Sequence, residues 1–275
     1  MTERIDNVIV RVPHPLIHFP FFFVSNNPEE GFFYSKPNKY GDLVTVQAPK
    51  TPRVREAIVF LASLTFFQDE VSPFDCDPIS RRVAVTISRK AWMKVAGFGR
   101  SGHDKEAFKD AVDILSKVVY EVEREGAKTK RKYKDEVFKP RRNRLPFRKA
   151  IFPGLFGDVI FHENDTITIH VLQDFVQGLD KHALRVSLAH MLQMRGHVAR
   201  ALTFIMYGRS SWSGTWEELA ELVRIDHWKE RWKQKQSLKK ALDEMQGKGF
   251  TYESTKTTVV LKRTAGLTKT LPDYS

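Results

Sequence analysis

The sequence has a single cysteine, Cys76, among its 275 residues. One thiol cannot build an internal disulfide framework or a zinc site made of several cysteines. No apolar run approaches the roughly 18 residues that a membrane-spanning helix needs, and no short apolar signal core opens the chain. We therefore expect a cytoplasmic protein in a reducing compartment, with no membrane partner.

Acidic residues are in the minority. The 45 lysine and arginine residues outnumber 33 aspartates and glutamates, so the formal net charge is +12. Residues 126–149 hold eleven basic and two acidic side chains, and residues 224–248 hold eight and four, whereas residues 1–125 balance at 17 of each sign. A merely solubilising surface would spread its charge, so two basic zones that face a polyanion are expected. The alternative is a solvated loop and a solvated helix face.

The patterns predict an α+β chain, mostly helical, with two tandem units. Dense proline and aromatic residues make residues 1–50 an irregular, strand-rich arm. Residues 51–175 follow the order helix, strand, helix, helix, strand, strand, with a basic insertion at 126–149. Residues 176–265 repeat that order, and residues 266–275 form a loose tail. This is the element order of the winged helix-turn-helix, so we expect two such domains in tandem.

Specific signals set the boundaries in the first unit. Thr51 before Pro52 predicts a helix cap, and Ser88 predicts a second one. A long helix is expected from Asp104 to Arg124, followed by strands over 151–161 and 166–172.

The second unit has equally clear signals. A helical stripe over 188–206 has a break at Gly196, and residues 211–213 suit a short strand. Thr215 and Glu218 form a capping box that opens the next helix. The third helix is expected over 229–246, ending at Gly247, with a hairpin after it.

This third helix carries the main candidates for contact with DNA. Between 231 and 240 it has five basic residues and no acid. Lys233, Gln236, Ser237, Lys240 and Glu244 are expected to point away from the core. Lysine and arginine can bind guanine and glutamine can bind adenine in the major groove. The candidate set is Arg231, Lys233, Gln234, Lys235, Gln236, Ser237, Lys239 and Lys240, with Lys256 in the following hairpin turn.

The corresponding helix of the first unit is mixed in charge. Lys105 and Lys109 share its exposed face with Asp110, Asp113 and Lys117. With Arg100 before the helix, this face suits phosphate contact or dimerisation better than base recognition. The basic insertion is expected to be a mobile arm along phosphates or in a minor groove, through Lys130, Arg131, Lys132, Arg141, Arg142 and Arg144.

Three patterns imitate other kinds of site. Gly97, Gly99 and Gly102 spell G-x-G-x-x-G, but the motif follows a helix, so a turn is expected and not a dinucleotide site. The run His182–Arg185, with His190 downstream, is similar to part of a tyrosine recombinase box whose other members are missing. His14 and His18 match no metal signature, and we expect no metal, cofactor or catalytic residue.

At the third helix of the second unit the sequence resembles TrfA-type plasmid replication initiators. The stretches that carry the resemblance are 201–207, 215–222, 233–245 and 250–253, and the likeness is weaker over 51–175. It implies two winged helices that bind repeated origin sites (iterons), help to open the origin, and recruit a host initiator and helicase. It implies no catalytic residues and leaves homodimer formation open. A winged-helix transcriptional repressor is the alternative within the same class, and a tyrosine recombinase is the alternative from another class.

The basic insertion generates a first prediction. Neutralising Lys130, Arg131, Lys132, Arg141, Arg142 and Arg144 together should weaken DNA binding almost uniformly across sequences and flatten its salt dependence, because each lost phosphate contact removes about 0.9 from the slope of log K against log salt. The free energy of unfolding should barely change. Titrations at two salt concentrations measure the effect, and normal binding by the six-fold variant would contradict it.

Overall fold

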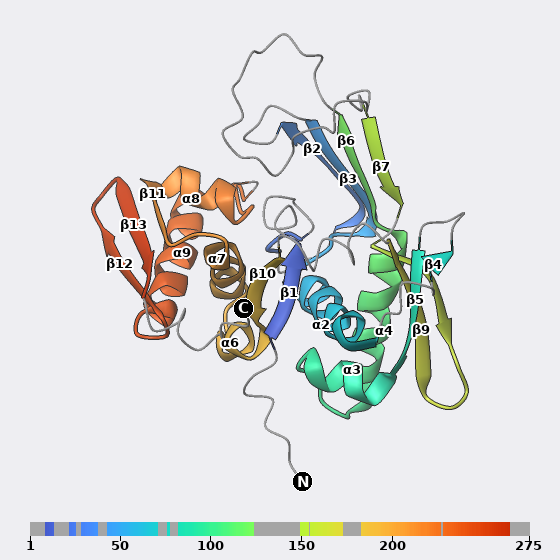
Figure 1. Ribbon diagram of the computed structural model, residues 1–275. Coiled ribbons are helices and arrows are strands. Elements are labelled where there is room, and N and C mark those ends of the chain that lie inside the picture. Colours follow the sequence, from blue (N-terminus) through green and yellow to red (C-terminus); the bar gives the residue numbers. More distant parts are fainter. Residues whose placement is uncertain are drawn as a thin grey trace, which may run out of the picture.

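The computed structural model describes residues 9–13, 22–25, 29–37, 43–70, 76–77, 82–123, 149–153, 155–172, 183–226 and 228–264. Two units lie side by side, with helix α2 and strands β1 and β10 between them (Figure 1). Strands contribute almost as many of the described residues as helices do. The fold is a mixture of helix and strand, and the expectation of a mostly helical chain overstated the helix.

The first unit has the predicted order of elements. These are α2 (Val54–Glu70), β5 (Arg82–Ser88), α3 (Arg89–Val95), α4 (Gly102–Lys117), β8 (Phe156–Phe161) and β9 (Thr166–Leu172). Their sheet has the order β4-β5-β9-β8, where β4 (Cys76–Asp77) is a two-residue strand. The β8–β9 turn includes Asp165, whose φ of 65° lies in the left-handed region.

Serine caps fix the two helices that follow β5. The Ser88 hydroxyl accepts from the backbone N–H of Ala91 at 3.5 Å, as predicted, and that of Ser101 accepts from the N–H of Asp104 at 3.1 Å. Between them Gly97 has a φ of 77°, a conformation that favours glycine. The G-x-G-x-x-G pattern is thus the turn between α3 and α4.

The start of α2 differs from the expectation. The Thr51 hydroxyl accepts from the backbone N–H of Glu29 at 2.9 Å and does not cap the helix, which begins at Val54. The carboxylate of Glu56 accepts from the N–H of Arg53 at 2.8 Å instead. A buried acid in the first turn therefore replaces the hydroxyl cap.

A second sheet interrupts the first unit. Its order is β2-β3-β6-β7, from β2 (Glu30–Pro37), β3 (Leu43–Lys50), β6 (Val119–Glu123) and β7 (Lys149–Pro153). Residues 30–37 and 43–50 are therefore strands of a regular sheet, as a strand-rich segment predicts, and not irregular, because β3 is a central strand with Val44 and Val46 buried.

Two predicted elements change because of this sheet. The helix expected to reach Arg124 ends at Lys117, since the β-branched residues Val118 and Val119 favour extended backbone and lead into β6. The single strand expected over 151–161 is instead two strands, β7 and β8, in different sheets. The basic insertion connects β6 to β7, and residues 124–148 lie outside the described part of the chain.

The second unit repeats the order of the first, except that two helices come before its first strand. Its elements are α6 (Leu188–Gln193), α7 (His197–Tyr207), β11 (Ser211–Thr215), α8 (Trp216–Leu222), α9 (Arg231–Met245), β12 (Phe250–Ser254) and β13 (Thr258–Arg263). Its sheet has the order β11-β13-β12, so the first strand again pairs with the last. The capping box is confirmed, with the Thr215 hydroxyl 3.2 Å from the Glu218 nitrogen and the Glu218 carboxylate 2.7 Å from the Thr215 nitrogen.

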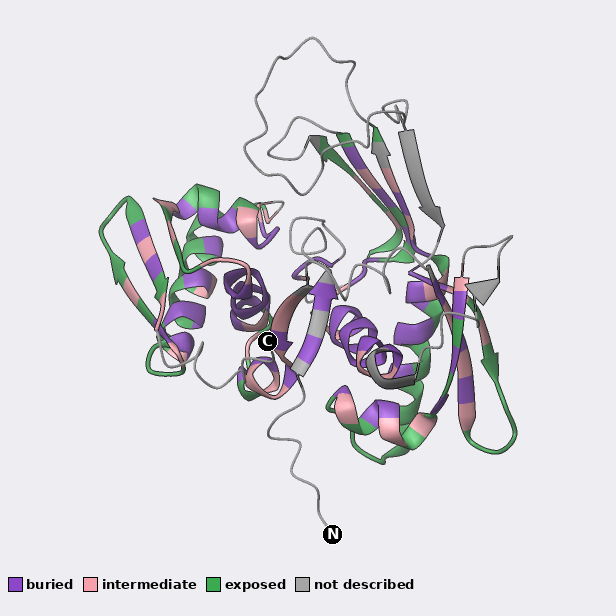
Figure 2. Cartoon of the chain, viewed as in Figure 1, coloured by how far each residue is buried: buried purple, intermediate pink, exposed green. Residues whose placement is uncertain are grey.

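The two units share one continuous core. Strand β1 (Ile9–Pro13) pairs with β10 (Ala183–Ser187), and α2 packs on β1, α3 and α4 while also contacting α6 and α7. Figure 2 shows buried residues along α2 and α7. A guanidinium N–H of Arg224 donates to the Phe22 carbonyl at 3.1 Å, and Lys36 forms an ion pair with Asp226. The units are thus packed together by apolar and polar contacts.

Trp92 connects the elements of the first unit. Its ring is fully buried, with edge-on contacts to Phe108 and Phe156 at centroid distances of 5.0 and 5.5 Å. Its indole N–H donates to the Val59 carbonyl at 2.9 Å. One side chain from α3 therefore contacts α2, α4 and β8.

Replacing Trp92 by alanine should lower the free energy of unfolding by about 3–5 kcal/mol, because the change leaves a large cavity and removes a buried hydrogen bond. The matched control is Trp232→Ala, whose ring is 62% exposed; its effect should stay within about 0.5 kcal/mol. Urea unfolding measures both, and equal effects would contradict the central role of Trp92.

Candidate nucleic-acid interface

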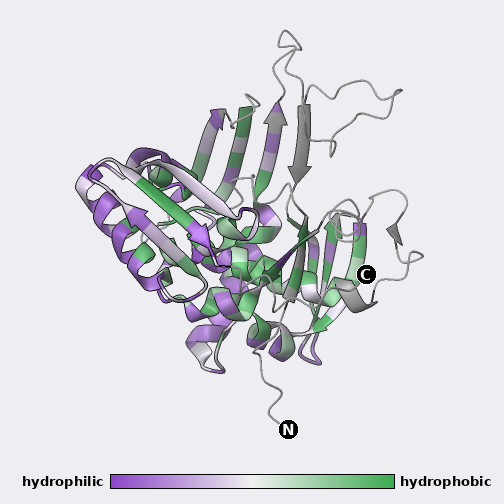
Figure 3. Ribbon diagram, turned by 60° about the vertical axis from the view of Figure 1, so that its left-hand side comes forward, coloured by the Kyte–Doolittle hydropathy of each residue, from purple (hydrophilic) through white to green (hydrophobic). Residues whose placement is uncertain are grey.

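Helix α9 presents one charged side to solvent. Leu238, Ala241, Leu242 and Met245 bury the other side against α7, α8 and β12. Of the candidates on this helix, Ser237 is partly exposed, and six are exposed: Arg231, Lys233, Lys235, Gln236, Lys239 and Lys240. Hydrophilic residues predominate over the outer part of this unit (Figure 3).

Gln234 is an exception to the predicted candidate set. Its side chain is only 8% exposed, and its amide donates to the carbonyls of Trp228 at 2.7 Å and Asp226 at 3.3 Å. It therefore joins α9 to the loop before it and does not face solvent. The spacing from Gln234 to Leu238 and Ala241 is that of the buried stripe, so the sequence contained this signal.

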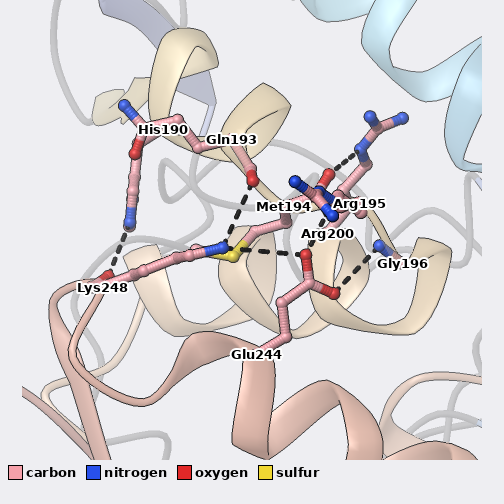
Figure 4. A network of polar contacts seen from close by, with 8 residues as sticks. All are labelled: His190, Gln193, Met194, Arg195, Gly196, Arg200, Glu244 and Lys248. Carbon is pink, nitrogen blue, oxygen red and sulfur yellow. Dashed lines mark hydrogen bonds and ion pairs between the residues drawn. The ribbon is translucent and has the colours of Figure 1, made fainter.

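Glu244 also differs from the expectation that it points away from the core. Its carboxylate accepts from the backbone N–H of Arg195 and from that of Gly196 at 3.0 Å (Figure 4). Gly196 is the N-cap of α7 and has no side chain to cap it, so an acid from another helix supplies the acceptor. Lys248 lies 3.8 Å from the same carboxylate.

The other acid of α9 is also engaged within the unit, since Asp243 accepts a hydrogen bond from the Tyr252 hydroxyl. Both acids lie in the last part of the helix. The exposed side from Arg231 to Lys240 therefore carries five cations and no carboxylate of its own helix. A carboxylate from outside the helix, Glu230, accepts from Lys233 at 2.9 Å and neutralises part of this charge.

An exposed tryptophan lies among these cations. Trp232 is 62% exposed, and the ammonium of Lys233 lies 5.3 Å from the centroid of its ring. Sequence reasoning did not select this residue. An aromatic residue beside two basic neighbours at the start of a helix is a signal that could have identified it.

The hairpin turn between β12 and β13 completes the surface. Lys256 is exposed in this turn, and its backbone carbonyl accepts from the ammonium of Lys235 at 2.8 Å. The N-terminal half of α9 and the hairpin turn are therefore one surface. Lys235 was predicted to contact DNA, but its ammonium is already bound within the protein.

The corresponding surface of the first unit is different. Arg100, Lys105 and Lys109 are exposed as expected, and so are Asp110 and Asp113. Two further acids lie in the β8–β9 turn, where Asp165 forms an ion pair with Arg89. The exposed face of α4 therefore carries charges of both signs, whereas the exposed side of α9 between 231 and 240 carries only positive ones. The insertion residues Lys130, Arg131, Lys132, Arg141, Arg142 and Arg144 lie outside the described residues.

Within the described ranges, no group of three or more His, Cys, Asp or Glu side chains is placed to hold a metal ion. No helix in those ranges is both long and apolar enough to cross a bilayer.

No protein-family model and no curated protein sequence matches the chain. Solved structures do match. A selenomethionine derivative of domains 2 and 3 of RctB has a TM-score of 0.59 and 12% identity, over 91% of this chain and 98% of that one. A second structure of RctB domains 2–3 has a TM-score of 0.51 and 11% identity, over 90% and 96%. At these identities the likeness shows a shared fold.

His190, on α6, connects α7 to the segment that follows α9. The Lys248 carbonyl can only accept, so the Nε2 of His190, 2.8 Å away, carries a proton and donates to it, and Nδ1 faces the Tyr207 hydroxyl at 2.9 Å. The ring stacks on Phe250 with centroids 5.6 Å apart. Burial lowers the pKa of His190, so the folded protein favours the neutral ring.

This geometry predicts a pH effect. As the pH falls below about 6.5, the unfolded chain takes up a proton that folded His190 resists, so the free energy of unfolding should fall. His190→Gln should be less stable at pH 7.5 but should lose less stability between pH 7.5 and 5. Urea titrations at both pH values test this, and an equal loss in both proteins would contradict a buried neutral ring.

Proposed function

We propose that this chain is a replication initiator that binds repeated origin sites on duplex DNA through two tandem winged helices, and that it acts by binding and not by catalysis. The observation that carries the proposal is the exposed side of α9, with five cations between 231 and 240 and both acids of the helix engaged elsewhere. A positively charged surface attracts the phosphate backbone of DNA. Once the helix lies against the DNA, its side chains can contact the edges of the bases.

Two further findings support this reading. Apart from β4 and the strands of its second sheet, the first unit has the order helix, strand, helix, helix, strand, strand, and the second has the same order with two helices, α6 and α7, before its first strand. In each unit the strand before the helix pair, β5 or β11, pairs with the last strand. The chain also shares its fold, over almost its whole length, with domains of RctB, which is a replication initiator. The resemblance of residues 188–263 to TrfA-type initiators is an independent argument from the sequence.

The proposed mechanism gives the two units different tasks. In the second unit, α9 enters the major groove, where Gln236 can pair with adenine and Lys233 with guanine, while the hairpin turn brings Lys256 to the backbone. In the first unit, the mixed charge of α4 suits backbone contact or contact with another protein. We also propose, from the resemblance to TrfA-type initiators, that the protein helps to open the origin and recruits a host initiator and helicase.

The alternatives make different demands on the site. A transcriptional repressor would use the same α9 surface, so only a replication assay separates it from an initiator. A tyrosine recombinase needs its histidine and arginine at a reaction centre. Of the matching residues, His182 lies outside the described part of the chain, and Arg185 lies on β10 in the pairing with β1. The downstream His190 is bound to Lys248 and Tyr207.

Specific recognition by Gln236 can be tested on a cognate repeat and on random duplex DNA. Gln236→Ala should weaken binding to the repeat by about 1–3 kcal/mol and leave random DNA almost unchanged, because a base contact is lost. Lys239→Ala should weaken both and reduce the salt slope by about 0.9. Gln193→Ala, an exposed glutamine on α6, is the matched control. Equal losses for Gln236→Ala on both DNAs would contradict base recognition.

The initiator role can be tested in cells. The gene with its flanking DNA, joined to a marker that has no replicon of its own, should be maintained as a plasmid. The Gln236→Ala variant should lose maintenance together with binding. Tight binding to a flanking repeat without maintenance would favour the repressor.

A further inference from the structure

The hairpin turn beside α9 is held by three consecutive backbone carbonyls. The Thr255 carbonyl accepts from the indole N–H of Trp216 at 3.3 Å, and the Thr257 carbonyl accepts from the backbone N–H of Trp216, also at 3.3 Å. Between them, the Lys256 carbonyl accepts from the ammonium of Lys235 at 2.8 Å. We call residues 255–257 the wing turn. Two residues of α8 and α9 therefore hold every carbonyl of this turn.

The wing turn is also braced internally. The Thr255 hydroxyl accepts from the backbone N–H groups of Thr258 at 2.9 Å and Thr257 at 3.2 Å, and the Thr255 N–H donates to the Thr258 carbonyl at 2.8 Å. These local bonds restrict the backbone conformation of the turn. Its position relative to α9 is therefore set by Trp216 and Lys235, while the residue Lys256 itself stays exposed.

Lys235 differs from its neighbours on the same helix. Its ammonium lies 5.1 Å from the centroid of the Trp216 ring, in addition to its bond with the wing turn. Trp216 is only 6% exposed, so the ammonium sits against a fixed aromatic surface. Lys239 and Lys240 are exposed and make no ion pair or polar contact with other described residues. They are free to meet a phosphate, whereas Lys235 is already bound on two sides.

We propose that Lys235 and Trp216 form a clamp that fixes the wing turn beside α9, so that Lys235 positions Lys256 for DNA and does not itself contact DNA. This inference rests on the proposed function for its DNA partner, while the clamp itself stands on the geometry alone. A preformed turn avoids the entropy of ordering a hairpin tip upon binding, which strengthens the complex.

The clamp can be tested without DNA. Lys235→Met keeps the aliphatic stem but removes the donor and the cation, so the wing turn should open more often, and trypsin should cleave after Lys256 about tenfold faster. Lys235→Arg, which keeps both properties, should stay near the original rate, and Lys239→Met is the matched control. Mass spectrometry follows this one cleavage, and thermal melting confirms that each variant is folded. An unchanged rate in Lys235→Met would overturn the clamp.

A double-mutant cycle separates positioning from direct contact. Lys256→Ala and Lys235→Met should each weaken DNA binding by about three- to tenfold, and the double variant should be no weaker than Lys256→Ala alone, because both changes remove the same wing contact. Fully additive losses, with a further drop in the salt slope, would show that Lys235 binds a phosphate and would overturn its positioning role. Faster cleavage in Lys235→Met, together with unchanged DNA affinity in both Lys235→Met and Lys256→Ala, would count against DNA binding by this wing and would leave the clamp intact.

Discussion

Helix α2 has apolar residues on nearly every side, and this constraint organises both units. Residues from Val54 to Leu64 are almost all buried, including the charged Glu56. A helix of this kind has to be enclosed. The helices and sheet of the first unit cover one side, and β1, α6 and α7 cover the other. The second unit is therefore part of the enclosure of the first, which explains why one core runs through both.

Two polar side chains of α9 bind neighbouring segments of the protein. Gln234 and Glu244 could have faced a ligand, but both bond to backbone groups of neighbouring segments. These bonds fix the helix near each end. The exposed side from Arg231 to Lys240 carries a row of cations, whose mutual repulsion an anionic partner can relieve.

Sequence patterns were informative where the contacts are local. The capping box at Thr215, the cap at Ser88 and the order of elements in both units depend on residues a few positions apart, and all are present in the structure. The sheet formed by β2, β3, β6 and β7 depends on pairings across the whole first unit, which no local pattern contains. The inward direction of Glu244 likewise depends on Gly196, far away in the sequence.

The pairing of β1 with β10 has a consequence for how the chain is made. Ile9 pairs with Ser187, so during synthesis β1 has to wait for a partner strand that is made much later. During that interval α2 and α4 can already pack together, while the side of α2 that β1 covers stays open to water. Closure of this strand pair is a late, long-range step of high contact order. The first unit can therefore cover this side of α2 only after β10 has been synthesised.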